Sequence, residues 1–373
     1  MIERTLEKLL KSKLHSGKAI VLLGARQVGK TTLLNMLFGN SDAVLWLNGD
    51  ELDVQTLFAT ISATRLKAIF GTKKIIVIDE AQRIQDIGLR MKLITDQIPE
   101  VQLVVTGSSS FELANKLNEP LTGRKWEYKM HPLSFAEMVA HHGLLEEKRL
   151  LEHRLIYGYY PEIITASGHE KELLKQLSSS YLYKDVLLLE QIKKPERLIA
   201  LLQALAYQVG AQVSFNELSR LTGLDAKTVE KYIEVLEQTY VVFRLGSFSR
   251  NLRSELKKSR KIYFYDNGIR NALIANFNHI ELRTDAGALW ENFIVSERMK
   301  RNQNTQNWTN SWYWRTKEQK EIDYIEEQNG LITAFECKWN PMAKHKIPKL
   351  FLETYPTSEF KIIHRDNFEE FLL

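Results

Sequence analysis

The clearest chemistry lies in a glycine-rich run near the N-terminus. The segment Gly24-Ala25-Arg26-Gln27-Val28-Gly29-Lys30-Thr31 fits the pattern GxxxxGK[ST] at every defined position and is followed by Thr32. Glycines let backbone N–H groups curl around phosphate oxygens without Cβ clashes, and a helix start adds its positive dipole end. In such a loop Lys30 contacts the β- and γ-phosphates, and the Thr31 hydroxyl ligates Mg²⁺. The pattern predicts that residues 24–32 bind ATP and Mg²⁺.

Two acids after an apolar run form the partner motif. The run Ile75–Ile78 precedes Asp79 and Glu80. Ligands in open α/β sheets bind at the carboxyl ends of the strands, so both carboxylates are expected beside the phosphate loop. There Asp79 would hold the Mg²⁺ shell and Glu80 would polarise the attacking water. Ser108, at the end of the next predicted strand, is a weaker candidate for orienting that water, because a strand-end turn explains it equally well.

A second group of residues, near the C-terminus, has the types found in metal-dependent nucleases. Glu336 and Lys338 are two apart on a predicted strand and therefore share a face. Asp323 lies on the preceding predicted strand, and Glu291 lies on a helix upstream. Such carboxylates can hold Mg²⁺, and the lysine can position the water that attacks a phosphodiester. Two other interpretations stay open: an ion pair on a solvated face, and a nuclease-like fold without activity.

A helix-turn-helix pattern lies in the middle of the chain. Ser214 and Glu217 form a capping-box pattern, Asp225 can cap a second helix, and two later strands indicate a winged form. The start of such a second helix can enter a DNA major groove. A basic stretch follows where the wing would lie, at Arg250, Arg253, Lys257, Lys258, Arg260 and Lys261. This charge could neutralise DNA phosphates, whereas charge runs are often only solvated and winged helices also serve as protein adapters.

The scaffold for these groups is predicted to be α/β. Strand patterns at 19–24, 44–50, 74–82 and 101–109 alternate with helical ones, which indicates a doubly wound parallel sheet. The pattern divides the chain into an α/β core at 1–132, a helical connector at 133–205, a winged-helix module at 206–268 and a C-terminal α/β domain at 269–373.

The composition limits the classes of function. The 373 residues carry a net charge of +5 and a single cysteine, Cys337. One cysteine excludes an intramolecular disulfide framework and a multi-cysteine zinc site. No apolar run approaches the ~20 residues of a membrane helix, so we expect a cytoplasmic protein with no membrane partner. Trp312 and Trp314 alternate on a predicted strand, which favours packing over base stacking.

A family resemblance extends over nearly the whole chain. The segments GARQVGKTTLL, VIDEAQ, VTGSSSFEL, LTGRKWEYKMHPLSFAEM, KIYFYDNGIRNAL, GALWENFI and ECKW resemble a bacterial and archaeal family of predicted AAA-superfamily ATPases. In that family an AAA-type domain precedes a domain of unknown function that is similar to PD-(D/E)xK nucleases. The tyrosine-rich YGYYP segment lacks the double glycine of the family's corresponding stretch, which leaves the role of that turn open.

The resemblance implies site residues as well as a fold. It places the phosphate-loop and metal residues at Gly29, Lys30, Thr31, Asp79 and Glu80, and a sensor-like position near Ser108. It also makes Arg124, in LTGR, a candidate arginine finger that acts within one subunit, between subunits of a homo-oligomer, or not at all. The implied fold is an AAA-type P-loop NTPase domain, a winged-helix module and a restriction-endonuclease-like α/β domain.

Two functions follow from these observations. In the first, a Mg²⁺-dependent AAA-type ATPase couples its nucleotide state to DNA binding or processing, with or without its own nuclease. In the second, the chain is a nucleotide-dependent switch or scaffold that binds a protein partner, and its nuclease-like domain is inactive.

Overall fold

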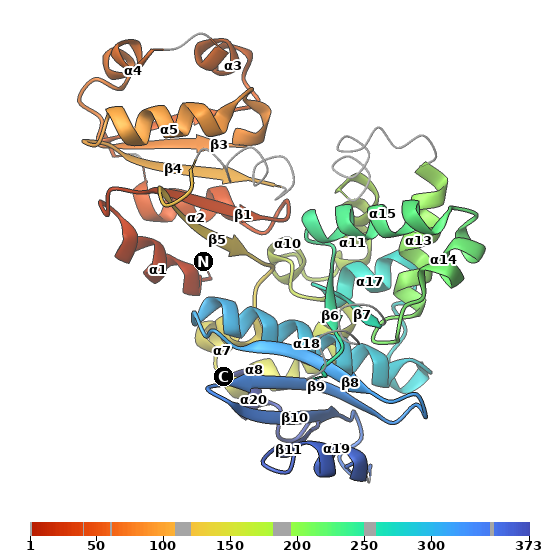
Figure 1. Ribbon diagram of the computed structural model, residues 1–373. Helices are drawn as coiled ribbons and strands as arrows, with labels where there is room; N and C mark the ends of the chain where they lie inside the picture. The colour runs from red at the N-terminus through yellow and green to blue at the C-terminus, as the bar shows by residue number, and fades with distance from the viewer. Residues whose placement is uncertain are drawn as a thin grey trace. The chain divides into compact units, whose positions relative to one another are not determined.

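The chain folds into two units, which we describe one after the other (Figure 1). The computed structural model describes residues 2–39, 41–59, 62–108, 121–181, 195–249, 259–343 and 347–373. The first unit extends to Pro132 and includes Gln238–Tyr240, and the second contains the other described residues from Leu133 onward. Within the described ranges, none of the helices is long and apolar enough to cross a membrane.

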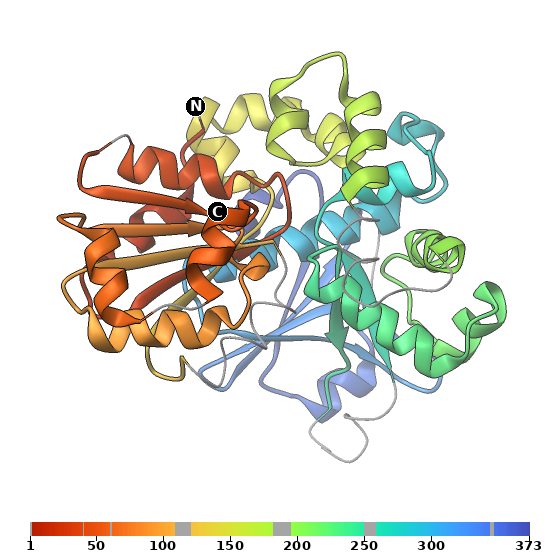
Figure 2. The same ribbon diagram turned by 90° about the horizontal axis from the view of Figure 1, so that it is seen from above.

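The first unit is built on a five-stranded parallel sheet with the order β2-β3-β4-β1-β5. Its strands lie side by side in Figure 2. They are β1 (Ala19–Gly24), β2 (Val44–Asn48), β3 (Ile75–Asp79), β4 (Gln102–Gly107) and β5 (Lys125–Met130). The helices are α1 (Thr5–Lys13), α2 (Lys30–Phe38), α3 (Leu52–Ala59), α4 (Ala63–Phe70) and α5 (Ile87–Gln97), with a short 3₁₀ turn η1 (Ala81–Arg83). Since β1 and β4 are buried throughout, the continuous apolar runs of the sequence correctly predicted the central strands.

Strand β5 was not predicted from the sequence. It alternates Lys125, Glu127 and Lys129 with Trp126, Tyr128 and Met130. This period of two is typical of a half-exposed strand, but it lacks the apolar run that marks the other strands of a parallel sheet. The strand pairs with β1 at the edge of the sheet, where one face can carry charge.

The second unit begins with a helical region. Its helices are α7 (Phe135–His142), α8 (Leu144–Arg149), α9 (Leu151–Tyr157), α10 (Pro161–Thr165), α11 (Glu170–Gln176), η2 (Leu177–Tyr181) and α13 (Pro195–Tyr207). The helix-turn-helix segment follows as α14 (Phe215–Thr222) and α15 (Ala226–Gln238). Both predicted N-cap residues are present, since Ser214 accepts from the Glu217 N–H and Asp225 accepts from the N–H groups of Lys227 and Thr228. At Ser214 this is the single side-chain cap bond of α14, not the reciprocal pair of a capping box. The Glu217 carboxylate accepts from Gln208.

A two-stranded antiparallel sheet follows the helical pair. It consists of β6 (Val242–Gly246) and β7 (Arg260–Phe264), close to the two strands predicted for a wing. The residues just after β6 attach to the C-terminal sheet, because Ser247 bridges Tyr313 and the Phe248 N–H donates to the Tyr313 carbonyl at 2.6 Å. The assignment of these elements to a winged-helix module stays a prediction.

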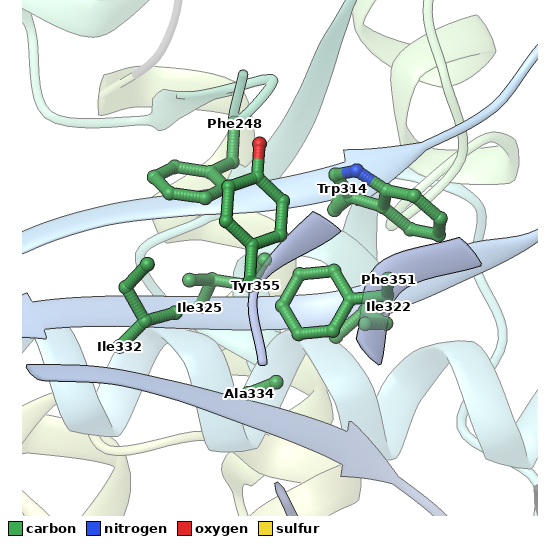
Figure 3. Packing of buried hydrophobic residues seen from close by; sticks show 8 residues of the cluster. All are labelled: Phe248, Trp314, Ile322, Ile325, Ile332, Ala334, Phe351 and Tyr355. Carbon is green, nitrogen blue, oxygen red and sulfur yellow. The ribbon is translucent and has the colours of Figure 1, made fainter. Parts of the chain in front are cut away.

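The C-terminal part contains a four-stranded mixed sheet with the order β11-β10-β9-β8. Its strands are β8 (Asn310–Arg315), β9 (Glu321–Gln328), β10 (Leu331–Cys337) and β11 (Glu359–Ile363). The helical elements there are α17 (Asn267–Leu273), η3 (Ile280–Leu282), α18 (Ala286–Asn304), α19 (Lys349–Thr354) and α20 (Glu369–Leu372). Figure 3 shows the core on one face of the sheet, where Trp314 packs against Phe351 and Phe248 packs against Tyr355. The packing role predicted for Trp314 is confirmed.

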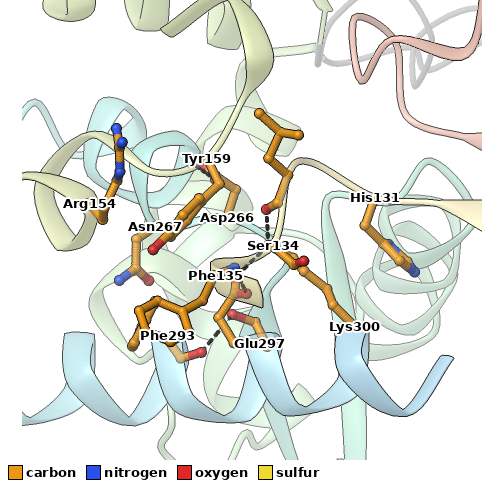
Figure 4. A network of polar contacts seen from close by, with 12 residues as sticks. His131, Ser134, Phe135, Arg154, Tyr159, Asp266, Asn267, Phe293, Glu297 and Lys300 are labelled. Carbon is orange, nitrogen blue, oxygen red and sulfur yellow. Dashed lines mark hydrogen bonds and ion pairs between the residues drawn. The ribbon is translucent and has the colours of Figure 1, made fainter. Parts of the chain in front are cut away.

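A buried polar network fixes the segment that enters the second unit (Figure 4). Ser134 and Glu137 form a capping box at the start of α7. Glu297, on α18, accepts from the Phe135 N–H at 2.7 Å and pairs with Lys300 at 2.6 Å. Lys300 also donates to the Leu133 carbonyl at 3.2 Å. Both charged side chains are buried, so each depends on the other for compensation.

Candidate functional site

The glycine-rich run forms the turn between β1 and α2. A Cβ atom at Gly24 would lie 2.2 Å from the carbonyl oxygen of Met130, so the close approach of β1 and β5 requires glycine there. Gly29 has a φ of +94° at the N-cap of α2, a backbone conformation that side chains disfavour. The strand-loop-helix context that the motif needs is therefore present, and the N-terminus of α2 faces the loop.

The groups predicted to bind phosphate and Mg²⁺ lie together at this edge of the sheet. Lys30 Nζ donates to the carbonyls of Gly24 and Ala25, both at 2.8 Å. The Thr31 hydroxyl donates to the Asp79 carboxylate at 2.7 Å. A hydroxyl and a carboxylate in contact are the hard oxygen ligands that Mg²⁺ prefers, so these residues fit the ion.

Glu80 follows Asp79 in a left-handed conformation with a φ of +49°. This turn aims the two acids differently. Asp79 accepts from Thr106, whereas Glu80 accepts from Gln82 Nε2 at 2.5 Å. Gln82 also donates to the Ser108 hydroxyl at 3.0 Å. Gln82 was not predicted from the sequence, although it stands two residues beyond Glu80 in DEAQ and that short spacing could have suggested a partner.

Gln82 is expected to act as a positioning residue for Glu80. The Gln82→Ala variant should lower kcat by about ten- to a hundredfold, because a freed carboxylate loses its orientation toward water. The KM for ATP should stay within about twofold, since the phosphate loop is untouched. Gln97→Ala, at an exposed position on α5, is the matched control. A change in KM with an unaltered kcat would contradict the positioning role. Steady-state ATPase kinetics measure both.

A second residue missed from the sequence braces the phosphate loop. Arg4 is buried and donates to the carbonyls of Val28, at 2.9 Å, and His131, at 2.6 Å. The guanidinium thereby ties a loop carbonyl to the segment after β5. No pattern around Arg4 points to this role, since its partners lie 24 and 127 residues away in the sequence.

Arg124 lies at the N-terminal ends of the strands, whereas the phosphate loop lies at their C-terminal ends. Its carbonyl accepts from the Ala19 N–H, at the start of β1, whereas the loop follows Gly24 at the end of that strand. Five residue steps along β1 separate the two ends of the strand by about 16 Å, which is more than an arginine side chain spans. The guanidinium pairs instead with Asp96 at 2.6 Å. Arg124 therefore cannot act as an arginine finger on the nucleotide of its own subunit.

Replacing Arg124 tests this placement. The Arg124→Ala variant should keep the ATPase rate within about twofold in dilute solution and lose at most ~1 kcal/mol of stability, since the ion pair with Asp96 is partly exposed. Measuring the rate across protein concentrations checks whether a second copy contributes. A tenfold loss at the lowest concentration, where single subunits prevail, would show that Arg124 does act on the nucleotide of its own subunit.

The nuclease-like candidates come together around a lysine. Lys261 Nζ, on β7, lies 2.8 Å from Glu291, 2.5 Å from Glu321 and 3.7 Å from Asp323. Glu336 pairs with Lys338 at 2.6 Å on the neighbouring strand β10. Within the part of the chain that the structure describes, no three His, Cys, Asp or Glu side chains are arranged so that they could hold a metal ion. The Mg²⁺ site predicted at Glu291, Asp323 and Glu336 is therefore not supported by the geometry.

Burial dominates the electrostatics of this cluster. It raises the pKa of Glu291 to about 7, reinforced by Asp323 and opposed by Lys261. Burial likewise raises the pKa of Glu336 to about 7, with Asp323 adding to the shift and Lys338 opposing it. Cys337 is buried, and burial raises the pKa of its thiol, with Asp323 and Glu291 adding to the shift. It is a packed, protonated thiol.

The predicted basic surface is smaller than the sequence suggested. Lys261 is fully buried in the carboxylate cluster and does not contribute to a surface, which corrects the sequence interpretation. Arg260 is near Glu230, with 3.6 Å between charged atoms. The remaining members, Arg250, Arg253, Lys257 and Lys258, lie outside the described residues.

The parallel sheet, the phosphate loop and the paired acids give the first unit the features of a P-loop NTPase domain. Residues 16–139 match the family described as AAA domain. Residues 148–280 and 286–369 match two domains of unknown function, DUF8612 and DUF4143.

Three similar proteins put these matches in context. The chain is 26% identical over 334 residues to an uncharacterized protein of Mycobacterium tuberculosis, covering 88% of this chain and 72% of the relative. It is 22% identical over 320 residues to an uncharacterized protein of Methanocaldococcus jannaschii, covering 80% and 70%. A Walker-type ATPase of Pyrococcus abyssi shares the fold at a TM-score of 0.53 and 16% identity, covering 74% of this chain and 96% of that structure.

Proposed function

We propose that the first unit binds ATP with Mg²⁺ and hydrolyses it, and that the chain is a nucleotide-dependent switch acting on a protein partner. The observation that supports hydrolysis most is the contact of Thr31 and Asp79 at 2.7 Å, with Glu80 directly following. These groups provide Mg²⁺ ligands and a general base at the edge of the sheet where the phosphate loop ends.

Each side chain has a defined task in this proposal. Lys30 would exchange its carbonyl partners for the β- and γ-phosphates, and Thr31 and Asp79 would hold the magnesium ion. The bound ion would supply charge stabilisation for the transferred phosphoryl group. Glu80 takes a proton from the attacking water, and Gln82 keeps the carboxylate oriented.

Coupling to DNA has little support among the described residues. The start of α15 would have to approach DNA phosphates, yet Glu230 and Glu234 interleave there with Lys227 and Lys231. The described residues directly after β6 attach to β8, since Ser247 bridges Tyr313. Both features reduce the positive potential and the accessible surface that DNA binding requires.

One experiment tests the proposal and its DNA-coupled alternative. ATPase rates of the full chain are measured with Mg²⁺ or EDTA and with or without supercoiled plasmid, and the plasmid where present also reports strand cleavage. We expect hydrolysis that requires Mg²⁺, is unchanged by DNA and leaves the plasmid intact. Hydrolysis that DNA stimulates severalfold would replace the protein-coupled proposal with the DNA-coupled one. An absence of hydrolysis under all conditions would overturn both.

A further inference from the structure

Lys261 is the central residue of the C-terminal carboxylate cluster. Its side chain is 1% exposed, and its ammonium group contacts carboxylates from α18 and β9. A lysine is almost never buried to this degree without paired charges, because removing it from water costs several kcal/mol. The carboxylates of Glu291, Glu321 and Asp323 provide that compensation. The ammonium is therefore part of the folded core and not a surface group that happens to point inward.

The ammonium lies among the carboxylates that a divalent cation would need as ligands. In the nuclease interpretation Glu291 and Asp323 share a metal ion, but here Lys261 Nζ lies 2.8 Å and 3.7 Å from these two side chains. Mg²⁺ binds its oxygen ligands at about 2.0–2.1 Å in a compact octahedral shell, which leaves no room for a cationic group among them. The metal and the lysine are mutually exclusive occupants of one position.

Lys261 cannot easily withdraw, because its strand is fastened to the same helix. The Phe264 N–H donates to Asn292 Oδ1 at 2.7 Å, and Asn292 Nδ2 donates back to the Phe264 carbonyl at 3.1 Å. Tyr263 donates its hydroxyl proton to Glu291 at 2.7 Å. The ammonium also lies 5.5 Å from the centre of the Tyr313 ring, a cation–π distance. These contacts hold β7, and with it Lys261, against α18.

The lysine of the nuclease-like pattern is also engaged. Lys338, which would position the attacking water, pairs with Glu336 at 2.6 Å. Asp323 Oδ2 accepts from the Cys337 N–H at 2.9 Å, so this carboxylate joins two strands. Each group required for metal-assisted cleavage thus has a structural partner.

We propose that the Lys261 ammonium permanently replaces the divalent cation of a nuclease-like site. The cluster consequently binds no metal ion, and it joins β7 to the C-terminal sheet as an ion-paired core. This inference is independent of the nucleotide site, which lies in the other unit.

Manganese binding to the full chain without nucleotide tests the inference. Every protein carries Thr31→Ala and Asp79→Asn, so that the nucleotide site contributes no ions. Free Mn²⁺ is measured by electron paramagnetic resonance for this background, for added Asp323→Asn, for added Lys261→Met, and for Lys261→Met combined with Asp323→Asn. We expect no bound Mn²⁺ in the background, about one equivalent after Lys261→Met, and none in the combined variant.

Two results would overturn the inference. The first is Mn²⁺ bound by the background protein and lost on adding Asp323→Asn alone, because the site would then coexist with Lys261. The second is a folded Lys261→Met variant that gains no Mn²⁺. Circular dichroism establishes whether that variant folds. If it does not fold, the amounts of Mn²⁺ bound by the background and by the background with Asp323→Asn are compared. Equal amounts are the expected result, and a loss of Mn²⁺ on adding Asp323→Asn would overturn the inference.

Discussion

Replacing Glu80 with glutamine is expected to slow ATP hydrolysis by about 10²–10⁴-fold, the contribution typical of a positioned general base. Glutamine keeps the shape of the side chain and can still contact Gln82, but it cannot accept a proton from water. ATP affinity should stay within about threefold, because the phosphate loop and the Thr31–Asp79 pair are unchanged. Single-turnover hydrolysis and equilibrium binding of a fluorescent ATP analogue measure the two quantities separately.

Two further variants show whether the effect of Glu80→Gln is specific. Glu100→Gln changes an exposed acid that precedes β4, at the opposite edge of the sheet, and should have no effect on either quantity. Lys30→Ala should abolish ATP binding itself, since it removes the positive charge facing the β- and γ-phosphates. Unchanged turnover in Glu80→Gln would remove Glu80 from the mechanism and leave the binding role of the loop in place.

Removing the buried charge of Lys300 is expected to destabilise the second unit by about 3–5 kcal/mol, the usual cost of breaking one side of a buried ion pair. Lys300→Met leaves Glu297 buried without its ammonium partner and deprives the Leu133 carbonyl of a donor. Burial already raises the pKa of Glu297, and Lys300 opposes that shift. The deficit should therefore grow as the pH rises above 4.5, the ordinary pKa, because the unpaired carboxyl is tolerated only while protonated.

Urea unfolding of the full chain at several pH values measures this effect. Adding Glu297→Gln to Lys300→Met should recover much of the loss, since the glutamine amide oxygen still accepts from the Phe135 N–H and the charge of Glu297 is no longer buried. Lys171→Met, at an exposed position on α11, is the control and should stay within about 0.5 kcal/mol of the parent. A double variant as unstable as Lys300→Met would show that packing, not charge, carries the loss.

Local sequence patterns were sufficient to predict those features whose conformation depends on neighbouring residues. The phosphate loop and the cap at Asp225 each lie within a few residues of the groups they serve. The acids that end β3 were predicted from the apolar run directly before them, although Asp79 contacts Thr31 from a distant part of the sequence. Their glycine, hydroxyl and carboxylate types are dictated by backbone geometry and by phosphate or N–H partners. The core role of Trp314 followed from alternation along one strand. In these cases the chemistry and the local conformation have the same cause.

The placement of distant residues could be decided only by the tertiary structure. Lys261 looked like part of a surface charge run because its neighbours in the sequence are basic, but folding pairs it with carboxylates 30 to 62 residues away. Arg124 was a candidate catalytic arginine, but the parallel pairing of β5 with β1 places it at the N-terminal ends of the strands, away from the phosphate loop. Residue type and spacing were enough to predict the candidate nucleotide site of this protein. Strand pairing and burial determined which charges are exposed, because a long-range contact has no fixed spacing in the sequence.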